Sequence, residues 1–221
     1  MQNKKALLLI SGGIDSPVAG KLAQEKGYKI SAIHFSQEPF TDNTPKLKSL
    51  LLCNKLGIKE MIIVEAGEEL KEIADKTYSE YYFILLKRFM LKTAEKIAKE
   101  NGTDYLITGE SLGQVSSQTL SNLNTINLST KIEILRPVLF MKKQQIIDLS
   151  IKYGFFEASK GKEMCDALAS GQPKTRSEET QILAEEKKCK MDELVKRAVK
   201  KQRIEKSKEK ITLPESVNTC K

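Results

Sequence analysis

Short apolar runs alternate with longer amphipathic stretches along the first two thirds of the chain. Four runs have the length and the β-branched content of buried strands. They cover residues 6–10, 29–35, 60–64 and 105–108. The stretches between them have helical spacing and lie at residues 17–26, 46–56 and 68–101, the last in two pieces. Strands that alternate with helices predict an α/β fold, in which a parallel sheet carries helices on both faces.

The same alternation continues once more and then gives way to helices. A fifth strand ends at Arg136-Pro137, and residues 141–153 form the next helix. The spacing in Thr175-Arg176-Ser177-Glu178 is that of a capping box, which opens a helix that leads into a second one at residues 191–210. We therefore expect a five-stranded domain over residues 1–177. Residues 178–221 then form a helical extension that ends in a disordered tail.

A glycine turn follows the first strand and precedes the first helix. Its sequence is Ser11-Gly12-Gly13-Ile14-Asp15-Ser16. Two glycines allow close backbone approach, and the hydroxyl groups of Ser11 and Ser16 add donors beside the free N–H groups of the helix start. The turn lacks the spacing and the lysine of a Walker loop. It is interpreted as a phosphate cradle, and the alternative is an ordinary turn with a helix cap.

Asp15 is unusual in such a turn, because a carboxylate beside a phosphate is repulsive unless a cation lies between them. Asp15 is therefore a candidate Mg²⁺ ligand. Ligands of parallel α/β sheets lie beyond the carboxyl ends of the strands. Leu9 and Ile10 end the first strand, and His34 and Phe35 end the second. All four are expected at one crevice, with His34, the only histidine, in nucleotide binding and not in acid–base chemistry.

A second glycine-containing stretch follows the fourth strand, at residues 108–120. Gly109 is expected to let the backbone approach a nucleotide, and Gln114 and Gln118 are expected to direct their amides into the crevice. The residues from Gly109 to Gly113 also fit the G-x-S-x-G pattern of serine hydrolases. That family places its histidine after the serine, whereas His34 lies far before Ser111.

Charge is concentrated near the end of the chain. The 221 residues include 37 basic and 29 acidic side chains, and residues 187–210 carry eleven basic against four acidic ones. A basic extension on a nearly neutral domain indicates a polyanionic partner, and the alternative is a solvated lysine-rich helix. No apolar run approaches the length of a membrane span, so no membrane association and a cytoplasmic location are expected. The four cysteines, at positions 53, 165, 189 and 220, contain no C-x-x-C pair.

The glycine turn resembles the SGGxDS signature of PP-loop pyrophosphatases, which split ATP into AMP and pyrophosphate. Together with HF at 34–35, TGESLGQVSSQTLSNL at 108–123 and LRPVLFMKKQQIIDL at 135–149, it is similar in order and spacing to the catalytic domain of the ThiI family, the tRNA uridine 4-sulfurtransferases. The resemblance runs from about residue 5 to beyond residue 175. It implies a PP-loop fold and ATP and Mg²⁺ as cofactors. It also implies that the substrate is tRNA, in which a uridine is converted to 4-thiouridine.

The resemblance also assigns residues. The implied ATP contacts are Leu9, Ile10, His34, Phe35, Gly109 and Gln118, with the cradle Ser11, Gly12, Gly13, Asp15 and Ser16. A basic contact of the long helix matches Lys87, where most relatives have arginine, and Arg88 follows it. The implied catalytic residues are Asp15, Lys143 and Cys165, the last in sulfur delivery.

The chain departs from fuller family members in three ways. It begins directly at the first strand without the RNA-holding THUMP region, and it contains neither a rhodanese module nor a C-x-x-C pair. The sulfur donor is therefore expected to be inorganic sulfide or a separate persulfide carrier, and a separate THUMP-type protein is a further candidate partner. A PP-loop ligase or sulfurtransferase that acts on a small molecule, for example in thiamine biosynthesis, is the alternative function.

Overall fold

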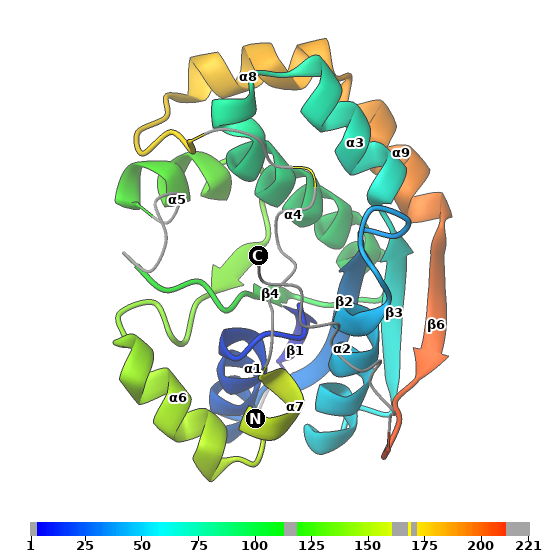
Figure 1. Ribbon diagram of the computed structural model, residues 1–221, viewed down its shortest axis with the longest axis vertical. Helices are drawn as coiled ribbons and strands as arrows, with labels where there is room; N and C mark the ends of the chain where they lie inside the picture. Colours follow the sequence, from blue (N-terminus) through cyan, green and yellow to red (C-terminus); the bar gives the residue numbers. More distant parts are fainter. Residues whose placement is uncertain (1–3, 113–118, 161–167, 169–171, 211–221) are drawn as a thin grey trace, which may run out of the picture.

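The structure of the protein is a computed structural model that describes residues 4–112, 119–160, 168 and 172–210. Its strands form one six-stranded sheet in the order β5-β4-β1-β2-β3-β6 (Figure 1). The strands are β1 Lys5–Leu9, β2 Lys29–Ser36, β3 Glu60–Glu65, β4 Tyr105–Ile107, β5 Glu133–Leu135 and β6 Gln202–Lys206. The first five are mutually parallel, which confirms the predicted α/β class.

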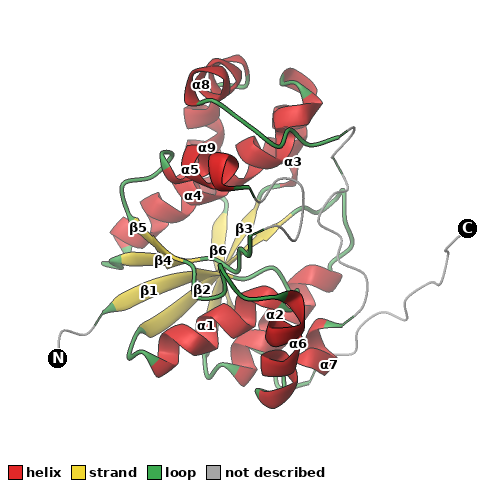
Figure 2. Cartoon of the chain, turned by 90° about the vertical axis from the view of Figure 1, so that its left-hand side faces the viewer, coloured by secondary structure: helices red, strands yellow, loops and turns green. Residues whose placement is uncertain are grey.

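Helices cover both faces of the sheet, as Figure 2 shows. One face carries α1 Asp15–Glu25, α2 Thr44–Lys55, α6 Lys143–Lys152 and α7 Phe156–Ser159. The other carries α3 Gly67–Lys76, α4 Tyr82–Glu100, α5 Leu120–Asn127, α8 Glu179–Lys188 and α9 Met191–Lys200, with the short 3₁₀ helix η1 Ser79–Tyr81 before α4. Because successive strand side chains point to opposite faces, β1 supplies Leu7 and Leu9 to one core and Ala6 and Leu8 to the other.

The strand order places a candidate site at one point of the sheet. From β1 the chain winds outward through β2 and β3, and it then returns to the other side of β1 for β4 and β5. The direction of winding therefore reverses between β1 and β4. In open α/β sheets ligands bind at this reversal, beyond the carboxyl ends of the strands. The two glycine-containing stretches of the sequence follow these two strands.

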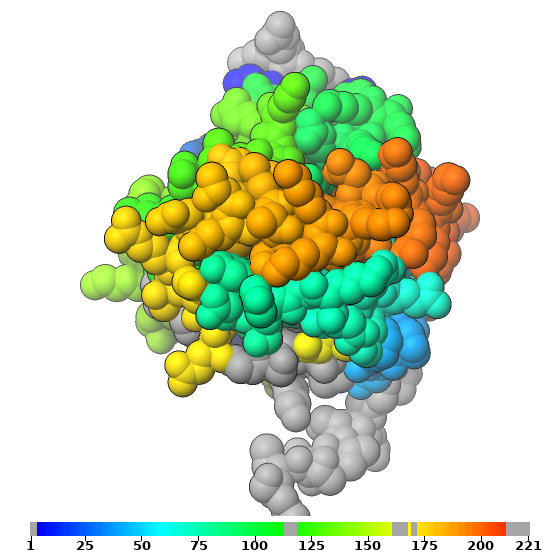
Figure 3. Space-filling view, turned by 90° about the horizontal axis from the view of Figure 1, so that it is seen from above, coloured from blue at the N-terminus to red at the C-terminus, as the bar shows by residue number. Residues whose placement is uncertain are grey.

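The C-terminal extension is not wholly helical. The predicted helix at 191–210 ends at Lys200, and residues Gln202–Lys206 pair antiparallel with β3 as a sixth strand. The pairing joins Ile62 to Ile204. Figure 3 shows the extension, yellow to orange, as a continuous strip beside α3 on the surface. Helix α9 packs on α4 and α3, so these residues complete the sheet and one of its helix layers.

The predicted capping box is also wrong. Helix α8 begins at Glu179, and its N-cap, Glu178, makes no side-chain capping bond. The predicted N-cap, Thr175, instead accepts at its carbonyl from the Thr119 hydroxyl at 2.7 Å, and the Ser177 hydroxyl donates to the Thr125 hydroxyl of α5 at 3.1 Å. The segment before α8 is thus bonded to α5 and its N-cap residue, and not to its own helix start. Within the described residues, none of the helices is both long enough and apolar enough to cross a membrane.

Candidate active site at the carboxyl edge of β1 and β4

The glycine turn leads directly from β1 into α1. Gly12 has a φ of +82°, and a Cβ there would lie 2.8 Å from the Pro45 carbonyl oxygen, so an L side chain is excluded for two reasons. The Ser16 hydroxyl accepts from the Ser11 N–H at 3.3 Å, and the Ser11 hydroxyl accepts from the Gly13 N–H at 3.4 Å. The turn is therefore closed on itself by its own serines, at the N-terminus of α1.

Gly109, just after β4, lies against this turn. A Cβ at Gly109 would be 2.7 Å from the backbone nitrogen of Ser16 and 2.9 Å from the carbonyl carbon of Asp15. These neighbours are backbone atoms, which cannot move aside as a flexible side chain would. The two glycine stretches that the sequence singled out thus meet, as expected from the adjacency of β1 and β4.

A cavity of about 300 Å³ opens at this edge of the sheet. Its volume is within the range of small-molecule sites. Most of the predicted nucleotide contacts line it: Leu9, Ile10, Ser11, Gly12, Gly13, Asp15, Ser16, His34, Phe35, Lys87 and Gly109. The structure thus brings together side chains that are up to a hundred positions apart in the sequence.

The cavity also has walls that the sequence analysis missed. Its apolar side includes Leu70 of α3 and the α4 residues Leu86, Met90 and Leu91, and its polar side includes Lys46, Lys48 and Glu110. Leu86 and Leu91 also belong to the buried core beneath the cavity, and the partly buried Met90 packs against that core. Lys46 and Lys48 could have been predicted to line the cavity, because they lie near the start of the helix that follows β2, at the carboxyl edge of the sheet.

His34 is buried and neutral. Its Nδ1 lies 2.9 Å from the Ile10 carbonyl oxygen and 3.2 Å from the Ser49 hydroxyl, which itself donates to the Pro45 carbonyl. Nδ1 therefore carries the proton and Nε2 is an acceptor. Burial lowers the pKa of His34 from 6.5 to about 4, although the bond to Ile10 opposes the shift. A neutral ring that joins the ends of β1 and β2 fits a structural and binding role.

The pH dependence of stability tests this environment. Unfolded His34 takes up a proton below pH 6.5, whereas the folded residue does so only near pH 4. Its contribution to the free energy of unfolding is therefore complete above pH 6.5 and is lost as the pH falls to 4, by up to about 3 kcal/mol. We would measure the free energy of unfolding by urea titration at several pH values between 7.5 and 4.5, for the wild type and for His34→Gln. The free energy of unfolding should fall less steeply with decreasing pH in the variant. Parallel slopes would contradict a neutral buried His34.

Asp15 and Lys143 form an ion pair at the edge of the cavity. The Lys143 Nζ lies 2.9 and 3.2 Å from the two carboxylate oxygens of Asp15. Asp15 is the first residue of α1, and Lys143 is the first residue of α6. A lysine at a helix N-terminus opposes the helix dipole. The Asp15 carboxylate faces this lysine, so the sequence-predicted catalytic residues of the two helices are brought together.

Lys87 is held by a buried carboxylate. Its Nζ donates to Glu110 Oε1 at 2.7 Å, and Arg136 Nε donates to Glu110 Oε2 at 2.7 Å. Arg88, the next residue on α4, was also predicted to bind nucleotide, and the structure corrects this. Arg88 is buried, does not line the cavity, and donates to Glu186 at 2.8 Å and to the Thr125 carbonyl at 2.5 Å. Consecutive helix positions point in directions about 100° apart, which separates the two side chains.

The serine-hydrolase alternative is not supported. Ser111 is buried and donates its hydroxyl hydrogen to the Met141 carbonyl at 3.0 Å. This bond ties residues 108–112 to the segment before α6. Ser111 therefore has a structural environment and does not present an exposed nucleophile.

Two cysteines lie within the described residues, and both are buried. Burial raises the pKa of Cys53 to about 12, and burial with the nearby Glu186 carboxylate raises that of Cys189 to about 11. Sulfur chemistry requires thiolates, so neither thiol is suited to it. The burial of Cys189 also argues against a role for it as a second thiol beside Cys165. Cys165, Cys220, Gln114 and Gln118 lie outside the described residues.

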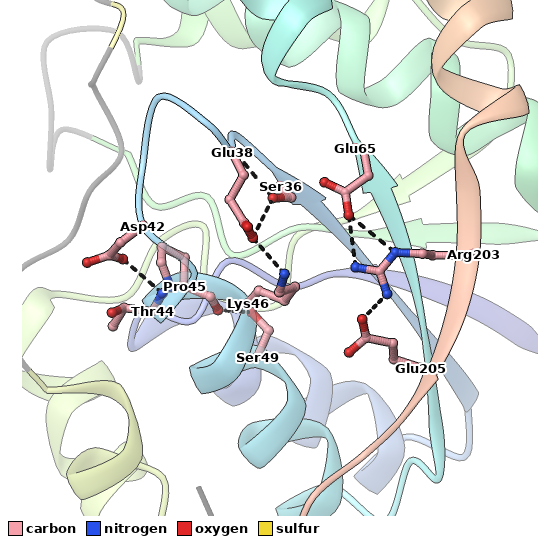
Figure 4. A network of polar contacts seen from close by, with 10 residues as sticks. All are labelled: Ser36, Glu38, Asp42, Thr44, Pro45, Lys46, Ser49, Glu65, Arg203 and Glu205. Atoms are coloured by element: carbon pink, nitrogen blue, oxygen red, sulfur yellow. Dashed lines mark hydrogen bonds and ion pairs between the residues drawn. The ribbon is translucent and has the colours of Figure 1, made fainter. Parts of the chain in front are cut away.

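Part of the basic charge of the extension is used internally. Arg197 bonds with Glu72 and Lys201 with Glu68 and Glu69, all on α3. Figure 4 shows Arg203 of β6 between Glu65 and Glu205. Nearby, Lys46 of α2 forms an ion pair of 2.7 Å with Glu38 of the loop after β2. Arg197, Lys201 and Arg203 of the extension thus fasten it to α3 and β3.

Comparison with known proteins identifies the family. Residues 1–191 match the family described as "Thiamine biosynthesis protein (ThiI)". The chain belongs to the ThiI family. That assignment agrees with the resemblance found in the sequence, and three of its signature stretches contribute lining residues to the cavity, at positions 11–16, 34–35 and 108–110.

Among curated relatives, the chain is 40% identical over 210 residues to "Probable tRNA sulfurtransferase" of Alkaliphilus oremlandii, covering 92% of this chain and 54% of that protein. It is 39% identical over 202 residues to the protein of the same name from Streptococcus uberis, covering 89% and 50%. The chain therefore spans about half the length of the ThiI relatives it matches.

Among solved structures, a 4-thiouridine synthetase in complex with RNA and bound ATP superposes with a TM-score of 0.86 at 32% identity, over 93% of this chain and 55% of that one. The NMN synthetase of Francisella tularensis superposes with a TM-score of 0.58 at 15% identity, over 97% and 90%. The second likeness shows the fold alone.

Proposed function

We propose that this chain catalyses ATP-dependent thiolation of tRNA, in which a uridine C4 oxygen is adenylated and then replaced by sulfur to give 4-thiouridine. The observation that carries the proposal is the meeting of Asp15 and Lys143 beside the Gly12–Gly13 turn, at the mouth of one cavity. Membership of the ThiI family and the chain's similarity to proteins named tRNA sulfurtransferases support this chemical reading of the geometry.

ATP is the proposed nucleotide. The apolar wall formed by Phe35, Leu70 and Leu86 suits an adenine ring, and the opposite wall, formed by the glycine turn, suits phosphates. The structure of a 4-thiouridine synthetase with bound ATP supports ATP as the ligand, because that structure superposes on 93% of this chain with a TM-score of 0.86. Gln118 remains a proposed contact, together with the cavity-lining residues named above.

Mg²⁺ is proposed at Asp15. Among the described residues, no group of three His, Cys, Asp or Glu side chains could hold a metal by itself. Mg²⁺ commonly binds through one or two carboxylates, with waters and substrate phosphates completing its octahedron, and a single Asp15 beside a phosphate cradle fits that mode. Bound there, Mg²⁺ would neutralise phosphate charge. Asp15 would then contact the metal, and Lys143 would be released toward the nucleotide.

The reaction requires one activation and one displacement. The uridine C4 oxygen attacks the α-phosphorus of ATP, a new P–O bond forms, and the bond to the departing pyrophosphate breaks. Sulfur then attacks C4, the C4–S bond forms, and the C4–O bond breaks as AMP leaves. Lys143, with its ammonium at the cavity edge, is placed to stabilise negative charge on the phosphoryl group during the first step.

The remaining parts of the proposal concern partners and organisation. Sulfur comes from inorganic sulfide or a separate persulfide carrier, with Cys165 in its delivery, and a THUMP-type protein is a candidate partner for holding tRNA. The proposed location is the cytoplasm. Residues 1–177 are proposed as the ATP pyrophosphatase domain, and residues 178–221 as an extension that supports it through α9 and β6.

Two measurements test the proposal. Incubation of the protein with ATP, tRNA and sulfide should give AMP and pyrophosphate, which ³¹P NMR distinguishes from ADP and phosphate. Mass spectrometry of tRNA nucleosides from cells with and without the gene should show loss of 4-thiouridine in the deletion. ADP as the product would contradict PP-loop chemistry, and an unchanged nucleoside profile would contradict the tRNA substrate.

One further candidate function has an observation in its favour. The family description names thiamine biosynthesis, which requires sulfur transfer to a small molecule and not to RNA. The same adenylation at Asp15 and Lys143 would serve it. In that case the deletion strain would require thiamine while its tRNA nucleosides stay unchanged.

A further inference from the structure

A buried carboxylate with two cationic partners forms part of the cavity wall. Glu110, just after β4, is 8% exposed. Its Oε1 accepts from Lys87 Nζ at 2.7 Å, and its Oε2 accepts from Arg136 Nε at 2.7 Å and from the Thr108 hydroxyl at 3.1 Å. These contacts join α4, the end of β4 and the segment after β5 in one polar cluster.

The two cations lie differently with respect to the cavity. Lys87 and Glu110 line it, whereas Arg136 is not among the lining residues. An isolated Lys87–Glu110 pair would present a neutral surface to an anionic ligand. With Arg136 bound to the second oxygen of Glu110, the cluster carries one positive charge in excess, and the cation that lies at the cavity is Lys87.

We infer that Glu110 and Arg136 are positioning residues for Lys87. Glu110 directs the Lys87 ammonium into the nucleotide cavity, and Arg136 compensates the charge of Glu110, so that Lys87 keeps its attraction for phosphate. The inference rests on the proposed function, because it takes ATP as the ligand. It adds two residues to the site, and both act on the nucleotide through their effect on Lys87.

A lysine needs such support more than an arginine does. Its ammonium is a point charge on a flexible stem, whereas the guanidinium of arginine is a rigid fork with fixed donor directions. The Lys87 side chain is 23% exposed, so without a hydrogen-bond partner it could adopt several rotamers. The bond to Glu110 selects one direction before the nucleotide arrives, which reduces the ordering that binding would otherwise require.

The electrostatics of Glu110 agree with a permanent anion. Burial by itself would raise the pKa of this carboxyl, but the charges of Lys87 and Arg136 outweigh burial and lower it to about 2. Glu110 is therefore ionised at neutral pH and can accept from Lys87 there, as a positioning role requires.

The same helix carries a matched cluster away from the cavity. Glu186 of α8 accepts from Arg88 Nε at 2.8 Å and from Lys92 Nζ at 3.0 Å, so it too is a buried carboxylate with one arginine and one lysine on it. None of these three residues lines the nucleotide cavity. Glu186→Gln therefore reports what breaking a buried cluster on α4 costs without changing the site.

The test is a double-mutant cycle on ATP binding, measured by isothermal titration calorimetry with Mg²⁺ and without tRNA. Glu110→Gln and Lys87→Met should each weaken ATP binding by about fivefold or more, and the double variant should bind no more weakly than Lys87→Met alone. Arg136→Gln should weaken binding by a similar factor, and Arg136→Lys should restore most of it because the charge returns. Glu186→Gln should leave the ATP Kd unchanged.

Several outcomes would overturn the inference. Additive effects of Glu110→Gln and Lys87→Met, or equal losses for Glu110→Gln and Glu186→Gln, would show a general structural role. If Glu110→Gln fails to fold, Glu110→Asp keeps the charge but shortens the reach by one methylene, and the same cycle with Lys87→Met applies. ATP binding by the wild type is measured first. A wild-type protein that binds no ATP would refute the proposed function and not this inference alone.

Discussion

Asp15→Asn is expected to abolish formation of AMP and pyrophosphate, with turnover lowered by about a hundredfold or more. The substitution keeps the shape of the side chain and removes its charge, so it removes both the ion pair with Lys143 and the proposed Mg²⁺ ligand. The fold should survive, because the Asp15 and Lys143 side chains are 24% and 44% exposed, and an exposed pair contributes at most about 1 kcal/mol.

The chain offers a matched control on the same pair of helices. Glu25, at the end of α1, accepts from the hydroxyl of Tyr153, which follows α6, at 3.0 Å. Glu25→Gln weakens a contact between the same elements at the opposite end from the cavity. Pyrophosphate release and the melting temperature should both be close to wild type in Glu25→Gln. Undiminished turnover in Asp15→Asn would show that Asp15 serves only the helix start.

Cys165→Ser is expected to stop thiolation of tRNA while ATP–pyrophosphate exchange continues. Adenylation precedes sulfur transfer and uses Asp15 and Lys143, so losing a sulfur carrier should leave it intact. A serine hydroxyl cannot carry a transferable sulfur atom. Thiolation would be measured as 4-thiouridine by its absorbance or by mass spectrometry, and exchange with labelled pyrophosphate on the same preparation.

The buried thiols provide the controls for this experiment. Cys53→Ala and Cys189→Ala should thiolate normally, because burial keeps both wild-type thiols protonated. If Cys165 carries a persulfide, its outer sulfur bonds to C4 as AMP leaves, and the uridine is then held on Cys165 through an S–S bond. An added dithiol should reduce that S–S bond and release 4-thiouridine. Normal thiolation by Cys165→Ser with sulfide as the donor would instead favour direct attack by sulfide.

The sequence predicted the elements whose signals are local. β1 is apolar on both faces, so its alternation feeds two cores and its strand character is evident from five residues. The glycines at 12 and 109 are required by backbone geometry that any side chain would disturb. The cavity between them could therefore be placed from the order of strands and turns alone.

The errors lie where distant contacts override local preference. Gln202–Lys206 contains one apolar residue, Ile204, and lies beside a helical run, yet it is a strand because β3 offers it an edge. Thr175 has the capping spacing, but its carbonyl accepts from the Thr119 hydroxyl and α8 begins only at Glu179. Arg88 and Lys87 are adjacent in the sequence, and only the packing of α4 shows that one is buried against α8 and the other lines the cavity.

The position of β6 has a practical consequence. The family match ends at residue 191, where α9 begins, so nearly all of α9 and the whole of β6 lie beyond it. A chain shortened at that boundary would keep every described cavity residue but would uncover the outer edge of β3, where the apolar residues 61–64 would present unpaired N–H and C=O groups. Such edges recruit other strands. Self-association, before any loss of nucleotide binding, is the expected first defect of the shortened protein.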